Sequence, residues 1–174
     1  MTRLFKGALL LVIAVFVLSA CSANIKEEQK ATSDAVSQAF NSTPMKANNK
    51  NKEISFGLPL GFEIKEKKAN NILLKNGTKT YILFYNQQEG PESHVVYEAT
   101  LNTKMNVDFK ETYKKDKKFG YLLIKEIDKN NHELTVGIGG VKITTEAKTK
   151  SMKSEAKAMM DIVNSVKNIK KEGQ

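Results

Sequence analysis

The chain is poor in the residues that most often build catalytic or metal centres. Its 174 residues include one cysteine, two histidines and no tryptophan. A single cysteine excludes an internal disulfide, so the folded part must be stabilised by its hydrophobic core alone. Neither His94 nor His132 has the neighbours in sequence that would complete a zinc site or a catalytic triad, and both are expected to be exposed turn residues. We therefore predict no metal, no cofactor and no catalytic residue.

Two other patterns with possible chemistry are incomplete. The carboxylates Glu89, Glu92 and Glu98 could act as an acid and a base, but isolated carboxylates of this kind are usually solvated. The Gly-Ile-Gly-Gly run at 137–140 ends a predicted strand without opening a helix, so we interpret it as a β-bulge and not as a dinucleotide loop. Aromatic residues alternate within strands and do not interleave a basic ridge, which argues against nucleic-acid binding.

Long hydrophobic runs are also absent, with one exception at the start of the chain. Arg3 and Lys6 precede an unbroken apolar run from Ala8 to Leu18, and small residues follow it. This order is typical of a secretory signal. A helix needs about 20 apolar residues to cross a bilayer, so the run is too short for a permanent span. We predict that residues 1–20 form a cleavable signal peptide.

The junction Leu18-Ser19-Ala20-Cys21 resembles the lipobox of bacterial lipoproteins. The resemblance implies that cleavage occurs between Ala20 and Cys21 and that the Cys21 thiol carries a diacylglyceryl group with acyl chains such as palmitate. Buried methylenes contribute about 0.8 kcal/mol each, so two chains suffice for stable anchoring. The protein would then sit on the cell membrane and face outwards. The alternative is a free or buried cysteine behind an ordinary signal.

The charge of the chain has one dominant sign. Without the leader, 26 basic residues stand against 19 acidic ones, a net charge of +7. This charge favours anionic lipid headgroups or wall polymers as partners. A lysine- and asparagine-rich chain with one arginine is also typical of an AT-rich genome, such as that of a Firmicute. The basic clusters Lys65–Lys68 and Lys110–Lys118 either converge on one face or protect strand edges from aggregation, and we favour the second interpretation.

Residues 21–52 are polar and are predicted to form a flexible tether behind the lipidated Cys21. Residues Lys26 to Phe40 could make a weak helix, but its apolar stripe is thin. From Asn41 to Lys52 no periodicity is present, which is typical of a linker. The expected role of this segment is to hold the domain a few nanometres from the lipid.

Residues 53–170 show alternating strand patterns followed by one strong helix pattern. Asn76-Gly77 between two apolar runs predicts a hairpin with a type I′ turn, and the second of these strands, 78–85, is apolar on both faces at 81–85 and therefore central. A short helix capped by Ser93 is predicted, although Val95-Val96-Tyr97 could equally form a strand. A second hairpin is predicted over 119–139. The closing helix should bury one stripe of apolar side chains. Its predicted members are Met152, Ala156, Met159, Val163 and Val166, widened by Met160, Ile162 and Ile169.

This order predicts an α+β fold: an antiparallel sheet of about six strands, a long C-terminal helix packed on one face and a short helix in the middle. The segments LPLGF (58–62), ILLKNGTKTYILFY (72–85), GGVKIT (139–144) and MMDIVNSVK (159–167) are together similar to small Firmicute lipoproteins with a DUF4367-like or Mog1/PsbP-like domain. That resemblance implies a binding or accessory role and supplies no catalytic residue.

The leading hypothesis is a non-enzymatic, lipid-anchored envelope protein whose sheet domain binds another membrane protein, a wall polymer or lipid. One alternative is a capture protein for a small apolar ligand, which would require a pocket between the sheet and the C-terminal helix. Another is an envelope enzyme, which would require a deep pocket with a perturbed carboxylate or histidine.

Overall fold

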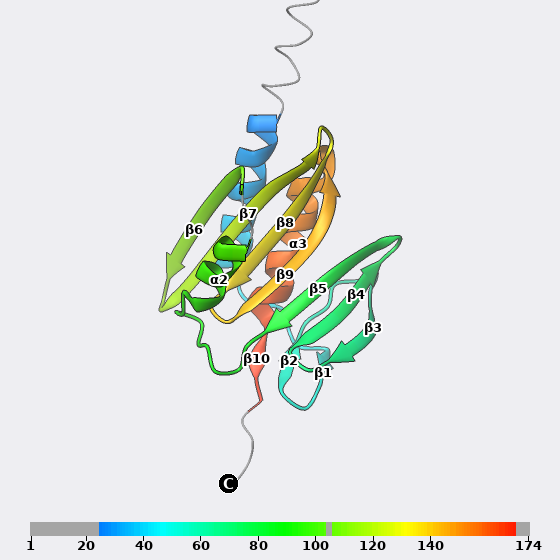
Figure 1. Cartoon of the computed structure of the whole chain (residues 1–174). Coiled ribbons are helices and arrows are strands. Elements are labelled where there is room, and N and C mark those ends of the chain that lie inside the picture. Colours follow the sequence, from blue (N-terminus) through cyan, green and yellow to red (C-terminus); the bar gives the residue numbers. More distant parts are fainter. Residues whose placement is uncertain (1–24, 104–105, 170–174) are drawn as a thin grey trace, which may run out of the picture.

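The computed structural model describes residues 25–103 and 106–169 (Figure 1). The predicted signal peptide, Ala20 and Cys21 lie outside these residues. The architecture is α+β, as predicted, with an antiparallel seven-stranded sheet in the order β3-β4-β5-β9-β8-β7-β6. A second sheet has the order β1-β2-β10. The main sheet thus has seven strands where about six were expected.

The main sheet contains β3 (Phe62–Lys68), β4 (Asn71–Asn76), β5 (Lys79–Tyr85), β6 (Phe109–Lys115), β7 (Lys118–Asp128), β8 (Asn131–Ile138) and β9 (Val141–Lys148). The small sheet contains β1 (Asn49–Lys50), β2 (Ile54–Phe56) and β10 (Lys167–Asn168). The helical elements are an N-terminal helix over residues 25–41, α2 (Val95–Thr103), η1 (Thr149–Ser151) and α3 (Met152–Ser165).

Helices cover both faces of the main sheet, but unequally. The N-terminal helix and α3 lie on one face, and the short α2 lies on the other (Figure 1). Because side chains alternate along a strand, each strand contributes to both faces. In β7, Leu122 and Ile124 belong to the large core, whereas Phe119, Tyr121 and Leu123 form a smaller cluster with residues of α2.

The predicted amphipathic helix at the C-terminus is confirmed as α3. Its apolar stripe is buried and consists of Met152, Ala156, Met159, Met160, Ile162 and Val163. The stripe ends earlier than expected, because Val166 adopts an extended backbone and the chain continues as β10. The Ile169 amide donates to the Glu53 carbonyl at 2.8 Å, and its side chain is exposed. Pairing with β2 therefore competes successfully with continuation of the helix.

The prediction of a flexible tether is wrong for residues 25–41, which form a helix packed against the sheet. Val36, Ala39 and Phe40 are all buried. At Gly120 of β7, an added Cβ would lie 2.7 Å from the Phe40 ring, so only glycine admits the ring at this approach. The sequence indicates this helix only weakly, because much of its buried stripe consists of small side chains. Small side chains contribute little to an apolar pattern but allow close packing.

Residues 42–52 are also ordered, by asparagine side chains that replace backbone partners. Asn48 donates from Nδ2 to the Leu58 carbonyl at 2.9 Å and accepts the Leu58 amide at 2.8 Å. The Asn51 Oδ1 accepts the amides of Glu53 and Ile54, both at 2.8 Å. Short polar side chains that bond nearby backbone favour defined turns, so the absence of hydrophobic periodicity did not mean disorder here.

The hairpins form where predicted, but two turns differ in detail. Asn76 pairs with Lys79, so the turn residues are Gly77 and Thr78, and only Gly77 has a positive φ, of 58°. A type I′ turn requires positive φ at both central residues, so this expectation is wrong. The pair Gly139-Gly140 is not a bulge but the two-residue turn between β8 and β9.

Candidate interaction surface

One part of the main sheet is left uncovered on the side of α2. There, β4, β5 and β9 place Leu73, Ile82 and Thr144 next to one another across the strands. Ile82 is 49% exposed, and Leu73 and Phe84 are half-buried. Strand β5 is central, as predicted, but only its odd-numbered side chains are enclosed. We call Leu73, Ile82, Phe84, Lys142 and Thr144 the open sheet face.

A groove of about 500 Å³ adjoins the open sheet face where β5 and β9 diverge. Their pairing stops at Tyr81 and Thr145, although β9 continues beside β8 to Lys148. At the point of divergence the Thr145 hydroxyl donates to the Thr80 carbonyl at 2.7 Å. The groove is lined by Thr78, Lys79, Thr80, Ile82, Asn131, Glu133, Thr144, Thr145, Glu146, Ala147 and Lys148. This mixed polar lining suits a partner with polar groups more than a small apolar ligand.

Lys142 fixes the boundary between the open sheet face and α2. Its Nζ lies 5.6 Å from the centroid of the Phe84 ring and donates to the Thr100 Oγ1 at 2.9 Å. Thr100 is itself buried on α2. A cation over an aromatic ring contributes about 0.5–1 kcal/mol at an exposed site, so Phe84 is held in a defined position.

Behind the groove, Glu155 of α3 links the helix to β5. The Tyr81 hydroxyl donates to the Glu155 Oε2 at 2.6 Å, and the Lys79 ammonium pairs with the Oε1. Burial, reinforced by the bond to Glu155, raises the pKa of Tyr81 well above its ordinary range. Tyr81 therefore stays a neutral donor, and both oxygens of Glu155 are engaged. The cluster acts as a structural link between sheet and helix.

Neither histidine belongs to the open sheet face. His94 is exposed, as predicted, and stacks on Phe119 with ring centroids 3.7 Å apart. His132 is buried, which contradicts the prediction, because even-numbered side chains of β8 face the large core. Its Nε2 lies 2.9 Å from the Thr149 Oγ1. Among residues 25–103 and 106–169, no group of three His, Cys, Asp or Glu side chains could hold a metal ion.

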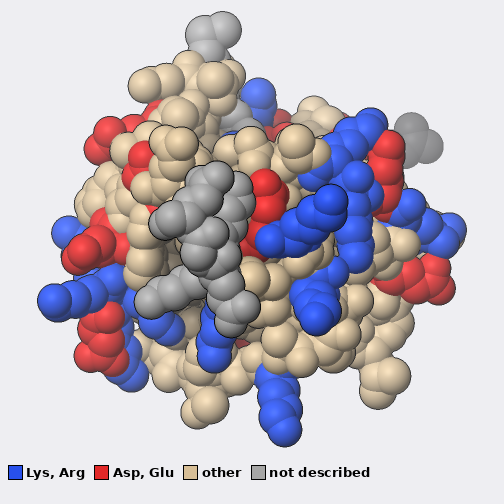
Figure 2. Space-filling view, turned by 90° about the horizontal axis from the view of Figure 1, so that it is seen from below, with Lys and Arg blue, Asp and Glu red and all other residues tan. Residues whose placement is uncertain are grey.

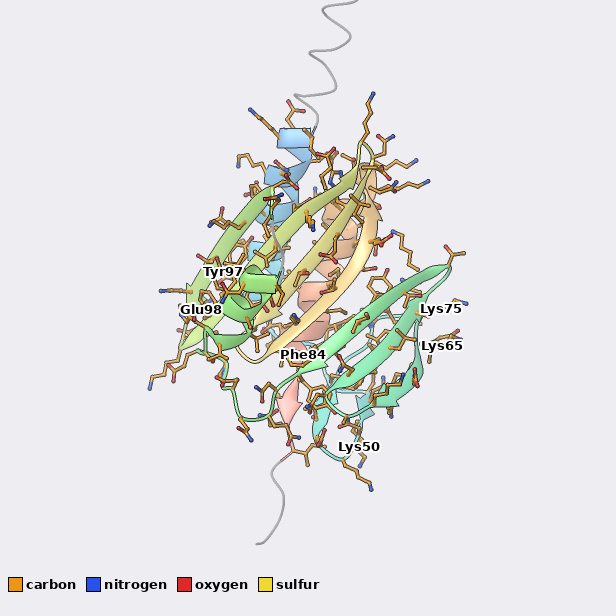
Figure 3. All side chains as sticks on the ribbon, in the orientation of Figure 1. Lys50, Lys65, Lys75, Phe84, Tyr97 and Glu98 are labelled. Carbon is orange, nitrogen blue, oxygen red and sulfur yellow. The ribbon has the colours of Figure 1, made fainter. Side chains whose placement is uncertain are left out.

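The three candidate carboxylates fall on the loop before α2 and on α2 itself. Glu89 accepts a hydrogen bond from the Ser93 hydroxyl, whose oxygen accepts the Val95 amide at 3.2 Å and so caps α2 as predicted. Glu92 and Glu98 are exposed, and Figure 3 labels Glu98 on the outer side of α2. This arrangement agrees with solvated side chains.

The glycine run at 137–140 has a packing role. An added Cβ at Gly139 would lie 2.1 Å from the Gly90 carbonyl oxygen, and one at Gly137 would overlap the Tyr121 ring. The Asn86 amide donates to the Gly140 carbonyl at 2.8 Å. Glycines at these positions therefore let a loop and a buried ring approach the β8–β9 backbone closely.

The two basic clusters lie on opposite edges of the main sheet, because β3 and β6 are its first and last strands. Figure 2 shows lysines on both flanks of the view, with acidic side chains among them. Lys65 pairs with Glu63 at 2.7 Å, and Lys68 pairs with Glu66 at 3.1 Å. The clusters do not converge, and lysines on edge strands hinder pairing with another chain. The interpretation as edge protection is therefore supported.

Comparison with known proteins identifies no family. No protein-family model matches the chain, and no curated protein matches it. The resemblance to lipoproteins with a DUF4367-like or Mog1/PsbP-like domain thus stays a prediction. Within the described residues, no helix is both long enough and apolar enough to cross a bilayer.

Proposed function

We propose that the chain is a lipid-anchored extracytoplasmic protein of the cell envelope that binds another envelope protein through its open sheet face. The diacylglyceryl group on Cys21 would hold it on the outer side of the cell membrane. The binding role is non-enzymatic. The observation that carries the proposal is the apolar strip of exposed Ile82 and half-buried Leu73 and Phe84 on an otherwise well-packed sheet.

An exposed apolar strip with a polar rim is typical of a protein-binding surface. The strip lies on the two paired strands β4 and β5, and β5 is paired in turn with β9, so the strip is presented on a rigid support. The separation of the basic clusters argues against a broad surface for an anionic wall polymer. Among the partners considered, an envelope protein therefore fits best.

The two alternative functions receive less support from the packing. Capture of a small apolar ligand would need space between the sheet and α3, but that interface is filled by the fully buried side chains of Tyr81, Leu83, Ile143, Met159 and Ile162. An enzyme would need an available acid, base or nucleophile, whereas the carboxylate of Glu155 is already bonded to Tyr81 and Lys79.

Replacing Cys21 with alanine tests the anchor. Because lipidation requires the thiol, Cys21→Ala should accumulate as an unprocessed precursor, and the mature form should disappear from the membrane fraction. Fractionation of native-host cells and mass spectrometry of the N-terminus measure both effects. Ser22→Ala is the matched control and should behave like the wild type. Normal processing and membrane retention of Cys21→Ala would contradict lipidation.

Replacing Ile82 with aspartate tests the open sheet face. The residue is 49% exposed, so Ile82→Asp should lower the free energy of unfolding by only about 1–2 kcal/mol and leave the fold intact. It should nevertheless reduce retention of a partner at least tenfold when the mature chain is cross-linked in cells and purified. Leu60→Asp, at a fully exposed apolar residue outside this face, is the control. Equal retention by both variants would exclude this face as the binding surface.

A further inference from the structure

The folded part of the chain begins close to Cys21. The described N-terminal helix already includes Ile25, whose side chain packs against the large core. Four residues span at most about 14 Å when fully extended. If the acyl chains on Cys21 enter the bilayer, the Ile25 end of the domain must therefore lie within that distance of the attachment point.

The turn of the β7–β8 hairpin lies at the same end of the molecule as Ile25. Phe40 lies against Gly120 of β7. The fifteen residues from Phe40 back to Ile25 rise about 22 Å along a helix. The seven residues from Gly120 to Ile127 advance about 23 Å along a strand. In Figure 1 the first turn of the N-terminal helix and the β7–β8 hairpin lie at the same end of the molecule.

An apolar side chain projects from this hairpin end. The β7–β8 register shifts between Glu126 and Asp128, which leaves Ile127 as the extra residue of a bulge. Bulges often redirect a side chain. Ile127 is 50% exposed, one of few large apolar side chains with such exposure in the described residues.

Three lysines lie at the same hairpin end as Ile127. Lys129 lies in the turn of the hairpin, Lys148 is opposite Asn131 in register, and Lys150 lies in η1; all three lysines are exposed. The Thr149 amide donates to the Asn130 carbonyl at 2.9 Å, which joins the hairpin turn to the β9–α3 junction. We call Ile127, Lys129, Lys148 and Lys150 the basic tip.

The carboxylates of this region do not cancel its positive charge. Residues 125–131 and 148–151 contain four lysines, one glutamate and one aspartate. The carboxylate of Asp128 accepts hydrogen bonds from the amides of Asn130 and Asn131, and these bonds lower its pKa. Asp128 therefore serves to shape the turn. The Asp108 carboxylate likewise accepts the Glu126 amide, at 2.6 Å, and Glu126 is a further acidic side chain beside the tip.

We infer that the basic tip rests on the anionic lipid surface of the membrane in which Cys21 is anchored. This inference rests on the proposed anchor, which brings the Ile25 end to the bilayer. Each lysine near an anionic bilayer strengthens partitioning roughly fivefold, and an apolar side chain can enter the headgroup layer. When the basic tip lies on the membrane surface, β7 and β8 extend away from the membrane. The open sheet face then faces sideways, where a membrane-bound partner can reach it.

Fluorescence quenching in vesicles tests this orientation. Cys21 is the only cysteine and would be acylated, so one introduced cysteine can be labelled alone. The lipidated protein would carry Asn130→Cys at the tip or Gln87→Cys at the other end, near the β8–β9 turn. Vesicles would contain phosphatidylglycerol and a lipid with a quencher on its headgroup. We expect at least fivefold stronger quenching at position 130 than at position 87.

A second set of measurements tests the role of charge and of Ile127. Quenching at position 130 should fall severalfold when phosphatidylcholine replaces phosphatidylglycerol, and also in a variant with Lys129→Gln and Lys150→Gln. Ile127→Asn should reduce it, whereas the control Leu60→Asn should not. Equal quenching at both labelled positions, or quenching at 130 that ignores lipid charge, would overturn the inference.

Flotation separates failure of the inference from failure of the anchor. Protein that floats with the vesicles but shows no quenching at position 130 would overturn the basic tip and leave the anchor intact. Protein isolated from its native host that neither floats nor carries acyl chains would overturn the anchor, and the inference with it.

Discussion

A chain shortened to begin at Glu53 is expected to lose its cooperative fold. Such a chain lacks the N-terminal helix, which buries Val36, Ala39 and Phe40 against the main sheet. It also lacks β1, which pairs with β2. Removal of the helix would expose apolar surface of the sheet, including the Tyr113 ring, whose centroid lies 5.8 Å from that of Phe40. The expected product is an unfolded chain or a compact state without fixed packing.

The magnitude follows from the side chains that are lost. Burying a large apolar side chain contributes about 1.5–3 kcal/mol, and the helix supplies Val36 and Phe40 in addition to buried alanines. Asn164 of α3 also loses its hydrogen bond to the Ala39 carbonyl, at 3.1 Å. A typical domain is stable by only about 5–15 kcal/mol in total. The loss is therefore of the same order as the whole stability.

Circular dichroism in urea measures the outcome for chains that begin at Ser22 and at Glu53. The longer chain should unfold in one transition, and the shorter one should show no transition or a broad one. A substitution provides the finer test. Phe40→Ala should lower the free energy of unfolding by about 3–5 kcal/mol, because it empties the space beside Gly120. Gln38→Ala, at an exposed position of the same helix, should change it little. A two-state transition of unchanged midpoint for the shorter chain would show that the helix is dispensable.

The features that the sequence predicted well are local. The turn at Gly77 lies between adjacent strands, and the α3 stripe repeats within fourteen residues. In both cases the pattern and the structure it specifies occupy the same short window. Helix propensity, apolar spacing and turn chemistry then agree, and such agreement across levels is what makes a segment predictable.

The open sheet face could not be predicted in the same way, because it depends on which strands become neighbours. Taken alone, the sequence of β5 is apolar on both faces of the strand, and Ile82 and Phe84 share one of these faces. The information that this side is open lies in β9, where Lys142, Thr144 and Glu146 alternate with smaller or apolar residues. These two strands are separated by more than fifty residues and pair only in the fold. Reading them together would have required the sheet order.

The predicted tether shows a second limit. Its helix buries several small side chains and places the Phe40 ring against Gly120, and its linker is ordered by Asn48 and Asn51. Both devices depend on a partner elsewhere in the chain, so a scan for large apolar residues overlooks them. The consequence is functional. Under the proposed anchor at Cys21, the domain would lie close to the membrane and would not be suspended on a long flexible spacer.

Ile162→Asp is expected to abolish the native packing of the whole domain. Ile162 is fully buried on α3, which contacts β2, β8 and β9. A carboxylate at this position would lose its hydration without gaining a basic partner, because the surrounding cluster consists of buried apolar residues. Loss of the apolar side chain adds a cavity cost of about 2–5 kcal/mol. The combined cost should equal or exceed the stability of a typical domain.

Ser154→Asp is the matched control, since it adds the same charge to the same helix. Ser154 is exposed in the first turn of α3, where a negative charge interacts favourably with the helix dipole. This variant should unfold at a urea concentration equal to or slightly above that of the wild type. Ile162→Asp should instead bind a hydrophobic dye and lose its near-ultraviolet circular dichroism while keeping some helical signal. A cooperative transition for Ile162→Asp within about 1 kcal/mol of the wild type would mean that α3 does not seal the core, and the packing described for the sheet would then be wrong.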